Sequence, residues 1–483
     1  MNNKSNRIYL LIALLGTLVQ WIIFKILYPY PDFFSDSYSY IYGAYAKLDI
    51  NIWPIGYSKF LLAFHHLTHS DTALVSFQYF FFELSALYFF FTIQYVFQPK
   101  RSSRNILFIF LFFNPLFLYL CNYINSDPIF VALSLLWITE LIWIVHRPRL
   151  YQIFTQAVLV FLAFTVRNNA YFYPVIALLA FVLSRQPNWK KIVGPIAGLV
   201  LIIPFIIHSE NVSFRMTGTR QFSLFTGWQL ANNALYMYEK IKVDSTVWKS
   251  AEAIQLDSIS RSFFRHIKND EDYRDYLSVY VGNFFIREPE APLKQYLSLH
   301  DYKHDPGGLI AWGRASAVFA PYGSTLIKTH PMAYAEYFML LNSKHYFFPP
   351  LEKLAVYNLG IDDVWPEAQY WFDYHSSKIT AVSKPAQGYI LVVFTFLFAF
   401  LHLYFIGYLV WLLAGRKYRY LPRILNQTLL VGSLFLFANF AFCVFATIIV
   451  LRYEVFPMIV IATLLLLLID AYPRAQNALN AIE

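Results

Sequence analysis

The stretch "MNNKSNRIYLLIALLGTLVQWIIF", residues 1–24, decides the fold class of this chain. Two basic residues, Lys4 and Arg7, precede an apolar run, and crossing the hydrocarbon core of a bilayer takes about 20 apolar residues. No small-residue cleavage site follows the run, as it would in a signal peptide. The stretch therefore predicts an uncleaved first membrane helix.

The composition of the whole chain agrees with this interpretation. Of its 483 residues, 58% are hydrophobic and only 14% are charged, whereas soluble domains are about 25% charged. One fifth are aromatic, which suits membrane interfaces, where Trp and Tyr are enriched. The net charge of +9 does not indicate a nucleic-acid partner, because the basic residues gather in short loops. The two cysteines, Cys121 and Cys443, lie in apolar runs and predict neither disulfides nor a metal site.

Apolar runs of spanning length recur along the chain. They occupy residues 8–28, 73–97, 105–122, 128–146, 151–166, 170–184, 192–208, 388–413, 425–450 and 455–471. The sequence therefore predicts an all-α polytopic membrane protein with about ten transmembrane helices.

The short loops predict the orientation. "QPKRSSR" (98–104), "HRPR" (146–149), "RQPNWKK" (185–191) and "GRKYRYLPR" (415–423) fall on the same side as the N-terminus. The positive-inside rule makes that side cytoplasmic. We expect a multi-pass plasma (inner) membrane protein with both termini in the cytoplasm.

Two outer segments divide the chain. Residues 1–208 form an N-terminal transmembrane module that includes a first outer loop, 29–72. Residues 209–387 form a mainly helical outer domain, and 388–483 carry the last spans. The outer domain has no Gly/Ser-rich linker at either end, so we expect it to lie over the first outer loop.

Four charged residues stand alone at the predicted outer membrane face. Asp36 lies in "FFSDSYSYIYGAY" (33–45) and Asp127 in "INSDPIFVAL", while Arg167 and Arg452 lie in "FTVRNNAYFYP" and "VLRYEVFPMIV". Each acid could simply cap a helix, and each arginine could snorkel to the interface. Arginines beside apolar spans are costly unless they are paired or hydrated. Together the four indicate a site in which Arg167 and Arg452 approach one another across a shared cavity.

Two further stretches are candidates. Tyr57 in "NIWPIGYSKFLLAF" is either an interface anchor or part of the donor site. "HDYKHDPGG" supplies His300, Asp301 and His304, which could bind a metal or the acceptor, although the Pro-Gly-Gly tail also suits a plain loop. Whether the protein needs a divalent metal or no cofactor is left open.

The order of these motifs resembles the GT-C glycosyltransferases that use polyprenyl-phosphate sugars, such as protein O-mannosyltransferases and lipid A aminoarabinose transferases. The resemblance rests on "DSYSYIYGA", "WPIGYSKFL", "SDPIF", "RNNAYFYP" and "RYEVFP". It covers residues 1–208, and 430–470 more loosely.

The resemblance implies an inverting transfer of a sugar from the lipid phosphate to an acceptor hydroxyl at the outer face. It implies Asp36 as the base, Asp127 as support for the donor pocket or a metal, and Arg167 and Arg452 near the donor phosphate. Where the aminoarabinose transferases have Lys-Pro, this chain has Trp53-Pro54. Arg167, Arg452, or Arg215 and Arg220 of the outer domain would then replace that lysine.

Three other interpretations remain open. A transporter or lipid flippase would carry ionisable residues near the bilayer midplane and often two related halves, and we expect a midplane nearly free of charge and find no repeat. A GT-C relative that polymerises or ligates glycans would rely on outer-loop arginines. The third is a membrane scaffold. The sugar, and whether the acceptor is a protein, a lipid or a glycan, are not specified by the sequence.

Overall fold

The computed structural model describes residues 4–480 except 268–269, 271–276, 278–281, 301–304 and 306–307. Within these residues the chain is helical, and no strand forms beyond isolated bridges such as Asp32 with Tyr123. The all-α prediction is therefore confirmed for the described part of the chain.

Eight helices in the described residues are long and apolar enough to cross a membrane, which is consistent with a multi-pass membrane protein. They are α1 (Lys4–Leu27), α4 (Asp71–Phe97), the pair α5 (Arg101–Phe112) and α6 (Pro115–Cys121), α7 (Asp127–His146), α10 (Asn188–Thr217), α20 (Ala386–Ala414), α21 (Arg423–Ala446) and α22 (Val455–Asn480). Two shorter apolar helices, α8 (Tyr151–Val166) and α9 (Tyr173–Leu183), occupy the other two predicted runs. The count of about ten spans stays a prediction.

The apolar helices differ in how deeply they lie in the bundle. In the most apolar 18-residue stretch of α7, 89% of the residues are buried, against 22% in the corresponding stretch of α1. Leu11, Leu15 and Ile26 of α1 are exposed, as expected of a helix whose outer surface faces lipid. The centre of the bundle is therefore α7, whose first residue is Asp127.

One boundary differs from its prediction. The run predicted to end at residue 208 continues as α10 to Thr217, past Pro195 and Pro204. It stops at Gly218, whose φ of +79° is the left-handed conformation that commonly ends a helix. The apolar run ends at residue 208 as predicted from the sequence, whereas the helix itself extends nine residues further.

Residues 209–387, which we call the large segment, contain a second apolar core between residues 228 and 338, whereas residues 354–379 contribute to the main core of the bundle. The main elements of the large segment are α11 (Thr226–Leu235), α12 (Ala251–Ile267), α14 (Phe284–Arg287), α15 (Pro292–Ser298), α16 (Leu309–Thr329), α17 (Pro331–Tyr334), a π-helical turn (Ala335–Met339), α18 (Leu340–Phe347), η6 (Glu352–Ala355) and α19 (Pro366–Trp371). The pair α11 and α16 packs closely, because Gly227 has no Cβ, which would lie 2.0 Å from the carbonyl oxygen of Ser316.

The large segment is anchored to the rest of the chain. Its apolar core includes Ile448 and Val450 from the connection between α21 and α22. It also touches residues 29–72, the first loop, which carries α2 (Ser35–Tyr45) and α3 (Gly56–His65). Trp365 stacks on Tyr38 with ring centroids 4.4 Å apart. These contacts agree with the expected packing of this segment over the first loop.

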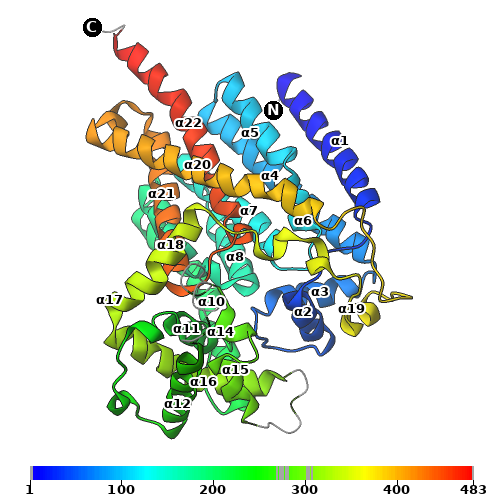
Figure 1. Ribbon diagram of the computed structural model, residues 1–483. Coiled ribbons are helices and arrows are strands. Elements are labelled where there is room, and N and C mark those ends of the chain that lie inside the picture. Colours follow the sequence, from blue (N-terminus) through cyan, green and yellow to red (C-terminus); the bar gives the residue numbers. More distant parts are fainter. Residues whose placement is uncertain are drawn as a thin grey trace.

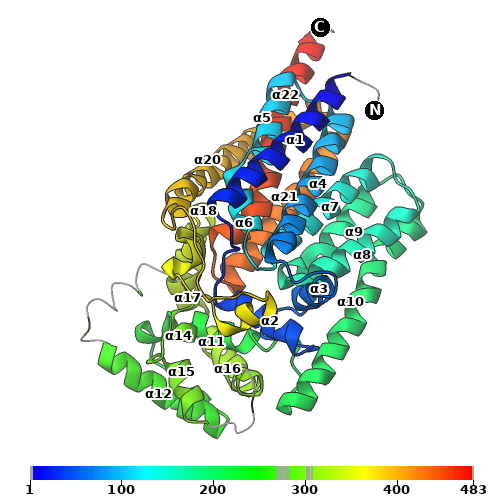
Figure 2. The same ribbon diagram turned by 90° about the vertical axis from the view of Figure 1, so that its right-hand side faces the viewer.

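The two termini lie at one end of the bundle and the large segment at the other (Figures 1 and 2). We call the end with α2, α3 and the large segment the loop end. The end where α1 begins, α4 ends, α5 begins and α7 ends is called the basic end.

Candidate functional site

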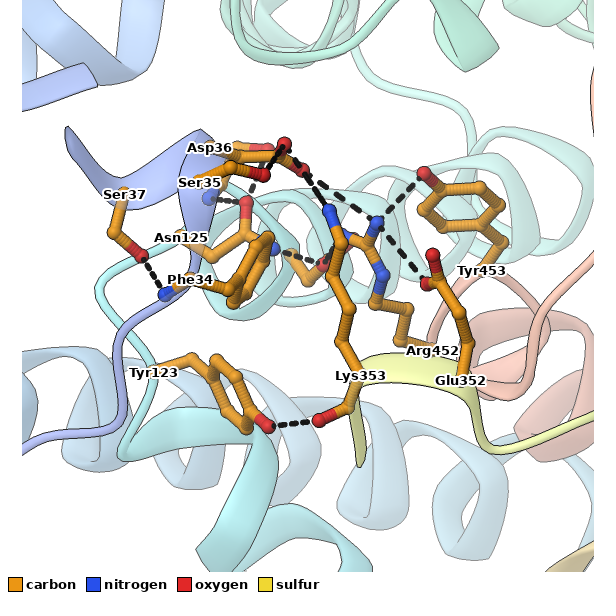
Figure 3. A network of polar contacts seen from close by, with 12 residues as sticks. Phe34, Ser35, Asp36, Ser37, Tyr123, Asn125, Glu352, Lys353, Arg452 and Tyr453 are labelled. Carbon is orange, nitrogen blue, oxygen red and sulfur yellow. Dashed lines mark hydrogen bonds and ion pairs between the residues drawn. The ribbon is translucent and has the colours of Figure 1, made fainter. Parts of the chain in front are cut away.

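Asp36 occupies the first turn of α2 without capping it. The residue before the helix is Phe34, whose backbone N–H donates to Ser37 Oγ at 3.2 Å. The capping role considered for Asp36 is therefore not the one it has. Its carboxylate is free to point away from the helix, toward residues of the large segment and of the last connection (Figure 3).

The carboxylate of Asp36 is buried between two cations. Lys353 Nζ donates to both of its oxygens at 3.1 Å, and a guanidinium nitrogen of Arg452 lies 3.6 Å from Oδ2. Burial by itself would raise the pKa of Asp36, but the charges of Lys353 and Arg452 outweigh it and hold the pKa below its usual value. Asp36 is consequently ionised at neutral pH.

Lys353 comes from η6 in the large segment, and its neighbour Glu352 completes the group. Burial lowers the pKa of Lys353 to about 8, against the opposing effect of Asp36. Glu352 lies 2.6 Å from a guanidinium nitrogen of Arg287 and 3.8 Å from one of Arg452. Glu352 adopts a φ of +50°, a conformation that costs energy for a residue with a side chain.

Sequence reasoning missed Glu352, Lys353 and Arg287. A signal was present, because Glu352 and Lys353 stand as a charged pair inside the apolar stretch "FFPPLEKLAVYNL", residues 347–359. An adjacent acid and base in such a stretch is unusual unless both find partners. Nothing in the sequence indicates which partners they find.

Asp127 forms the second half of the network. Its Oδ2 accepts from Asn125 Nδ2 at 2.6 Å and from Arg452 at 3.0 Å, and its Oδ1 is bound by Arg167. Both guanidiniums stack on the ring of Tyr453, with Arg167 at 4.4 Å and Arg452 at 4.5 Å. The structure thus brings Asp36, Asp127, Arg167 and Arg452 together at the loop end.

A cavity of about 360 Å³ opens beside this network. Asp36, Arg167 and Arg452 contribute its charged wall, and Trp53, Phe225 and Phe442 contribute aromatic surface. Trp53 of the first loop and Phe225 of the large segment are in ring contact at 4.6 Å. The cavity is therefore built jointly by the first loop, the large segment and the connections around Arg167 and Arg452.

Tyr57 does not line this cavity, and its assignment to the donor site stays a prediction. It is fully buried, its hydroxyl donates to Gln78 Oε1 at 2.7 Å, and its ring packs edge-on against Tyr40. Tyr40 does line the cavity. Tyr57 therefore supports the cavity wall from behind, through its contact with Tyr40.

The other predicted residues lie elsewhere. Arg215, Arg220 and His300 are not among the residues that line the cavity, and His300 Nδ1 lies 2.8 Å from the carbonyl oxygen of Tyr296. Asp301 and His304 lie outside the described residues. In the part of the chain that the structure describes, no three His, Cys, Asp or Glu side chains group closely enough to hold a metal ion.

Two buried acids lie well inside the spans, away from their ends, contrary to the expectation of a midplane nearly free of charge. Glu83 of α4 is 6% exposed and Glu140 of α7 is 8% exposed. Glu140 accepts from the hydroxyl of Tyr88 at 3.3 Å, whereas one carboxylate oxygen of Glu83 is buried without a hydrogen-bond partner. Apolar runs conceal such residues because one acid barely changes the mean hydropathy.

Comparisons with known proteins leave the chain without an assigned relative. It matches no family model, no curated protein and no solved structure. The function must therefore be argued from the cavity and its charges.

Proposed function

We propose that the protein is an inverting glycosyltransferase that moves a sugar from a polyprenyl-phosphate donor to an acceptor hydroxyl, with Asp36 as the base. The observation that carries the proposal is an ionised, buried carboxylate beside guanidinium groups in a cavity of partly aromatic lining. Such a cavity offers cations for the phosphate and aromatic surface for the rest of a lipid-linked phosphate sugar. The motif order that resembles GT-C enzymes supports the same assignment.

The charge balance of the network suits a phosphodiester. Four cations, Arg167, Arg287, Lys353 and Arg452, face three carboxylates, those of Asp36, Asp127 and Glu352. One positive charge is left over, and a phosphodiester carries one negative charge. The leaving phosphate monoester carries about −1.5 to −2 at neutral pH. The cations can therefore stabilise negative charge as it develops on the departing phosphate.

In the proposed reaction, the acceptor oxygen attacks the anomeric carbon from the face opposite the phosphate. The acceptor O–H gives its proton to Asp36, and the bond between the anomeric carbon and the phosphate oxygen breaks with its electron pair on the phosphate. Arg167 and Arg452 suit that phosphate, because guanidinium groups bind it with two parallel hydrogen bonds. Asp36 must first exchange part of its contact with Lys353 for the acceptor hydroxyl.

Lys353 can take the role of the lysine that the aminoarabinose transferases have where this chain has Trp53-Pro54. It brings a buried ammonium group from the large segment to the carboxylate of Asp36 in the cavity wall, without being one of the lining residues itself. We propose that Lys353, rather than Arg215 or Arg220, takes the place of that lysine. Asp127 then holds the two arginines in position for the donor phosphate, with or without a divalent metal.

The same proposal places the protein in the plasma (inner) membrane with both termini cytoplasmic and the cavity on the outer face. Basic loops at the N-terminal side support this orientation. Acceptor choice would reside in the large segment, since its residues line one side of the cavity. A protein, a lipid and a growing glycan are the acceptors to test, and transfer to a growing glycan would make the enzyme a polymerase or ligase.

The experiment that tests the proposal compares two carboxylates of the first loop. Asp36→Asn should lower transfer from a panel of polyprenyl-phosphate sugars in liposomes by at least about 100-fold, the contribution of a general base. Asp49→Asn is the matched control, because Asp49 is exposed and its ion-pair partner in the described chain is Lys59. Equal activity of Asp36→Asn and Asp49→Asn would refute the role of Asp36.

A second candidate function, a proton-coupled transporter or lipid flippase, is favoured by one observation only. Glu83 and Glu140 are acids buried inside spans, where ionisable residues are expensive and often functional. Glu83→Gln and Glu140→Gln should leave sugar transfer unchanged if the first proposal holds. Loss of lipid scrambling or substrate uptake in these variants, with no glycosyl transfer by the wild type, would favour the transporter.

A further inference from the structure

A second cavity lies at the basic end, separated from Asp36 by the length of the bundle. Its volume is about 650 Å³. It is an open cavity between the start of α1, the end of α4, the start of α5 and the end of α7, and its polar lining consists of Asn6, Gln94, Tyr95, Gln98, Arg104, His146 and Arg147. No part of the proposed transfer reaction uses it.

The cavity carries two guanidinium groups and no carboxylate in its lining. Arg104 Nε donates to the hydroxyl of Tyr9 at 3.1 Å, and a guanidinium nitrogen of Arg147 donates to the hydroxyl of Tyr95 at 2.7 Å. Within the described chain, neither arginine has a carboxylate in ion-pair distance. The cavity is therefore positive and can compensate a negative charge.

The acid near this cavity is already engaged. Asp470 of α22 accepts from the backbone N–H of Lys100 at 2.6 Å and from Ser103 Oγ at 2.9 Å, at the start of α5. It therefore satisfies the end of that helix. Gln94 adds an independent sign of a ligand, because its Nε2 is buried without a hydrogen-bond partner.

The chemistry of these groups selects a phosphate. Arginine pairs bind phosphate oxygens through planar, bidentate hydrogen bonds, and the amide of Gln94 can supply another donor. The cavity also has an apolar side, formed by residues such as Phe91 and Val96, at the place where apolar spans end. Basic pockets between spans at this level are typical sites for the headgroups of anionic lipids.

We propose that this cavity binds the phosphate headgroup of an anionic phospholipid, held by Arg104 and Arg147. The site is separate from the transfer site and does not depend on the proposed glycosyltransferase function. Occupancy would join α1, α4, α5 and α7 through one ligand. The bound lipid would thereby stabilise the folded bundle, because a ligand that binds only the native state does so by mass action.

The chain offers a closely matched control for these two arginines. Arg101 lies one turn before Arg104 on α5, and Arg149 follows Arg147 in the same short connection. Both are exposed and neither lines the cavity. The pair Arg104→Gln/Arg147→Gln and the pair Arg101→Gln/Arg149→Gln therefore remove the same charge from the same two regions.

The test measures lipid binding by the full-length protein. Delipidated protein in mild detergent is titrated with phosphatidylglycerol, phosphatidylcholine or inorganic phosphate, while the thermal unfolding midpoint and the bound lipid by native mass spectrometry are recorded. Phosphatidylglycerol should raise the midpoint of the wild type and of Arg101→Gln/Arg149→Gln. Arg104→Gln/Arg147→Gln should need at least about ten-fold more lipid for the same shift, the effect of losing charged hydrogen bonds.

The remaining outcomes either assign the site to another anion or overturn it. A shift with inorganic phosphate that only Arg104→Gln/Arg147→Gln loses supports the phosphate site and assigns it to a soluble anion. Equal responses of the two double variants overturn the site, as does an equal response to phosphatidylcholine and phosphatidylglycerol. If Arg104→Gln/Arg147→Gln does not fold, Arg147→Gln, an exposed residue, is compared with Arg149→Gln by the same measurements.

Discussion

Asp32 and Asp36 are both buried acids of the first loop, four residues apart, yet they have opposite surroundings. Asp32 is 1% exposed, and its hydrogen-bond donors in the described chain are neutral, among them the backbone N–H of Asn358 at 2.9 Å and Gln387 Nε2 at 3.3 Å. Burial raises its pKa to about 7. Asp36 contacts Lys353 and Arg452, and its pKa is lowered.

The difference shows that burial alone does not decide what a carboxylate can do. Desolvation favours the neutral acid in both cases, and only at Asp36 do nearby cations reverse the effect. Asp32 therefore serves as a hydrogen-bonded support that joins the first loop to residues 358 and 387. Asp36 stays charged and faces the cavity, as a base must.

The largest expected effect separates the two acids by activity. Asp36→Asn should lower sugar transfer by at least about 100-fold, whereas Asp32→Asn should lower it less than about ten-fold. The physical reason is that only Asp36 lines the cavity. Transfer rates of both variants in liposomes, normalised to folded protein, check this. A greater loss in Asp32→Asn would reverse the comparison.

Removing the cation shared by the network should have the next largest effect. Arg452 contacts Asp36, Asp127 and Glu352, so Arg452→Gln leaves three buried carboxylates short of positive charge. We expect a destabilisation of about 5 kcal/mol, near the upper end for breaking a buried ion pair. The thermal unfolding midpoint in detergent measures it, with the exposed Arg149→Gln as a control expected within about 0.5 kcal/mol of wild type.

The third expected difference between Asp32 and Asp36 is the pH dependence of the protein's stability. The pKa of Asp32 is raised when the protein folds, so the folded state binds more protons between pH 4 and 7. Its stabilising contribution is complete below about pH 4 and is lost as the pH rises through 7, by on the order of 4 kcal/mol in total. Asp36, with a lowered pKa, contributes stability above about pH 4 that is lost on further acidification.

Asp32→Asn should therefore flatten the fall in unfolding midpoint between pH 4 and 7. The slope that remains is expected from Glu454, whose pKa burial raises to about 8. Midpoints of the wild type, Asp32→Asn and Asp49→Asn across this range provide the measurement. An unchanged slope in Asp32→Asn would show that Asp32 is ionised like Asp36.

The smallest effect concerns the exposed acid of the same loop. Asp49 pairs with Lys59 at 3.0 Å, and both side chains are about half exposed, 53% and 43%. Lys59→Gln should cost less than about 1 kcal/mol, because water and salt screen such pairs. Unfolding midpoints at low and high salt check this, and a larger, salt-independent loss would mean that the pair is effectively buried.

The sequence was a good guide wherever the signal is local. Apolar runs placed the long helices, because hydrophobicity and spanning length are properties of neighbouring residues. The end of α10 was not predicted, because a helix can continue into polar sequence after its apolar run has ended. The motif order also predicted that Asp36, Asp127, Arg167 and Arg452 lie in one region, and their roles there are part of the proposed function. The sequence did not show that Tyr57 is buried behind the cavity, because a buried tyrosine and a cavity tyrosine look alike in sequence.

The amino-acid sequence by itself determined that the chain is helical, apolar and suited to cross a membrane several times, since these properties follow from composition and short-range pattern. Only the tertiary structure decided the partners of the buried charges. Lys353 lies 317 residues from Asp36 in the chain, and Arg104 and Arg147 meet around one cavity from different helices. Electrostatic energy depends on distance in space and on exclusion of water, and neither is written along the chain.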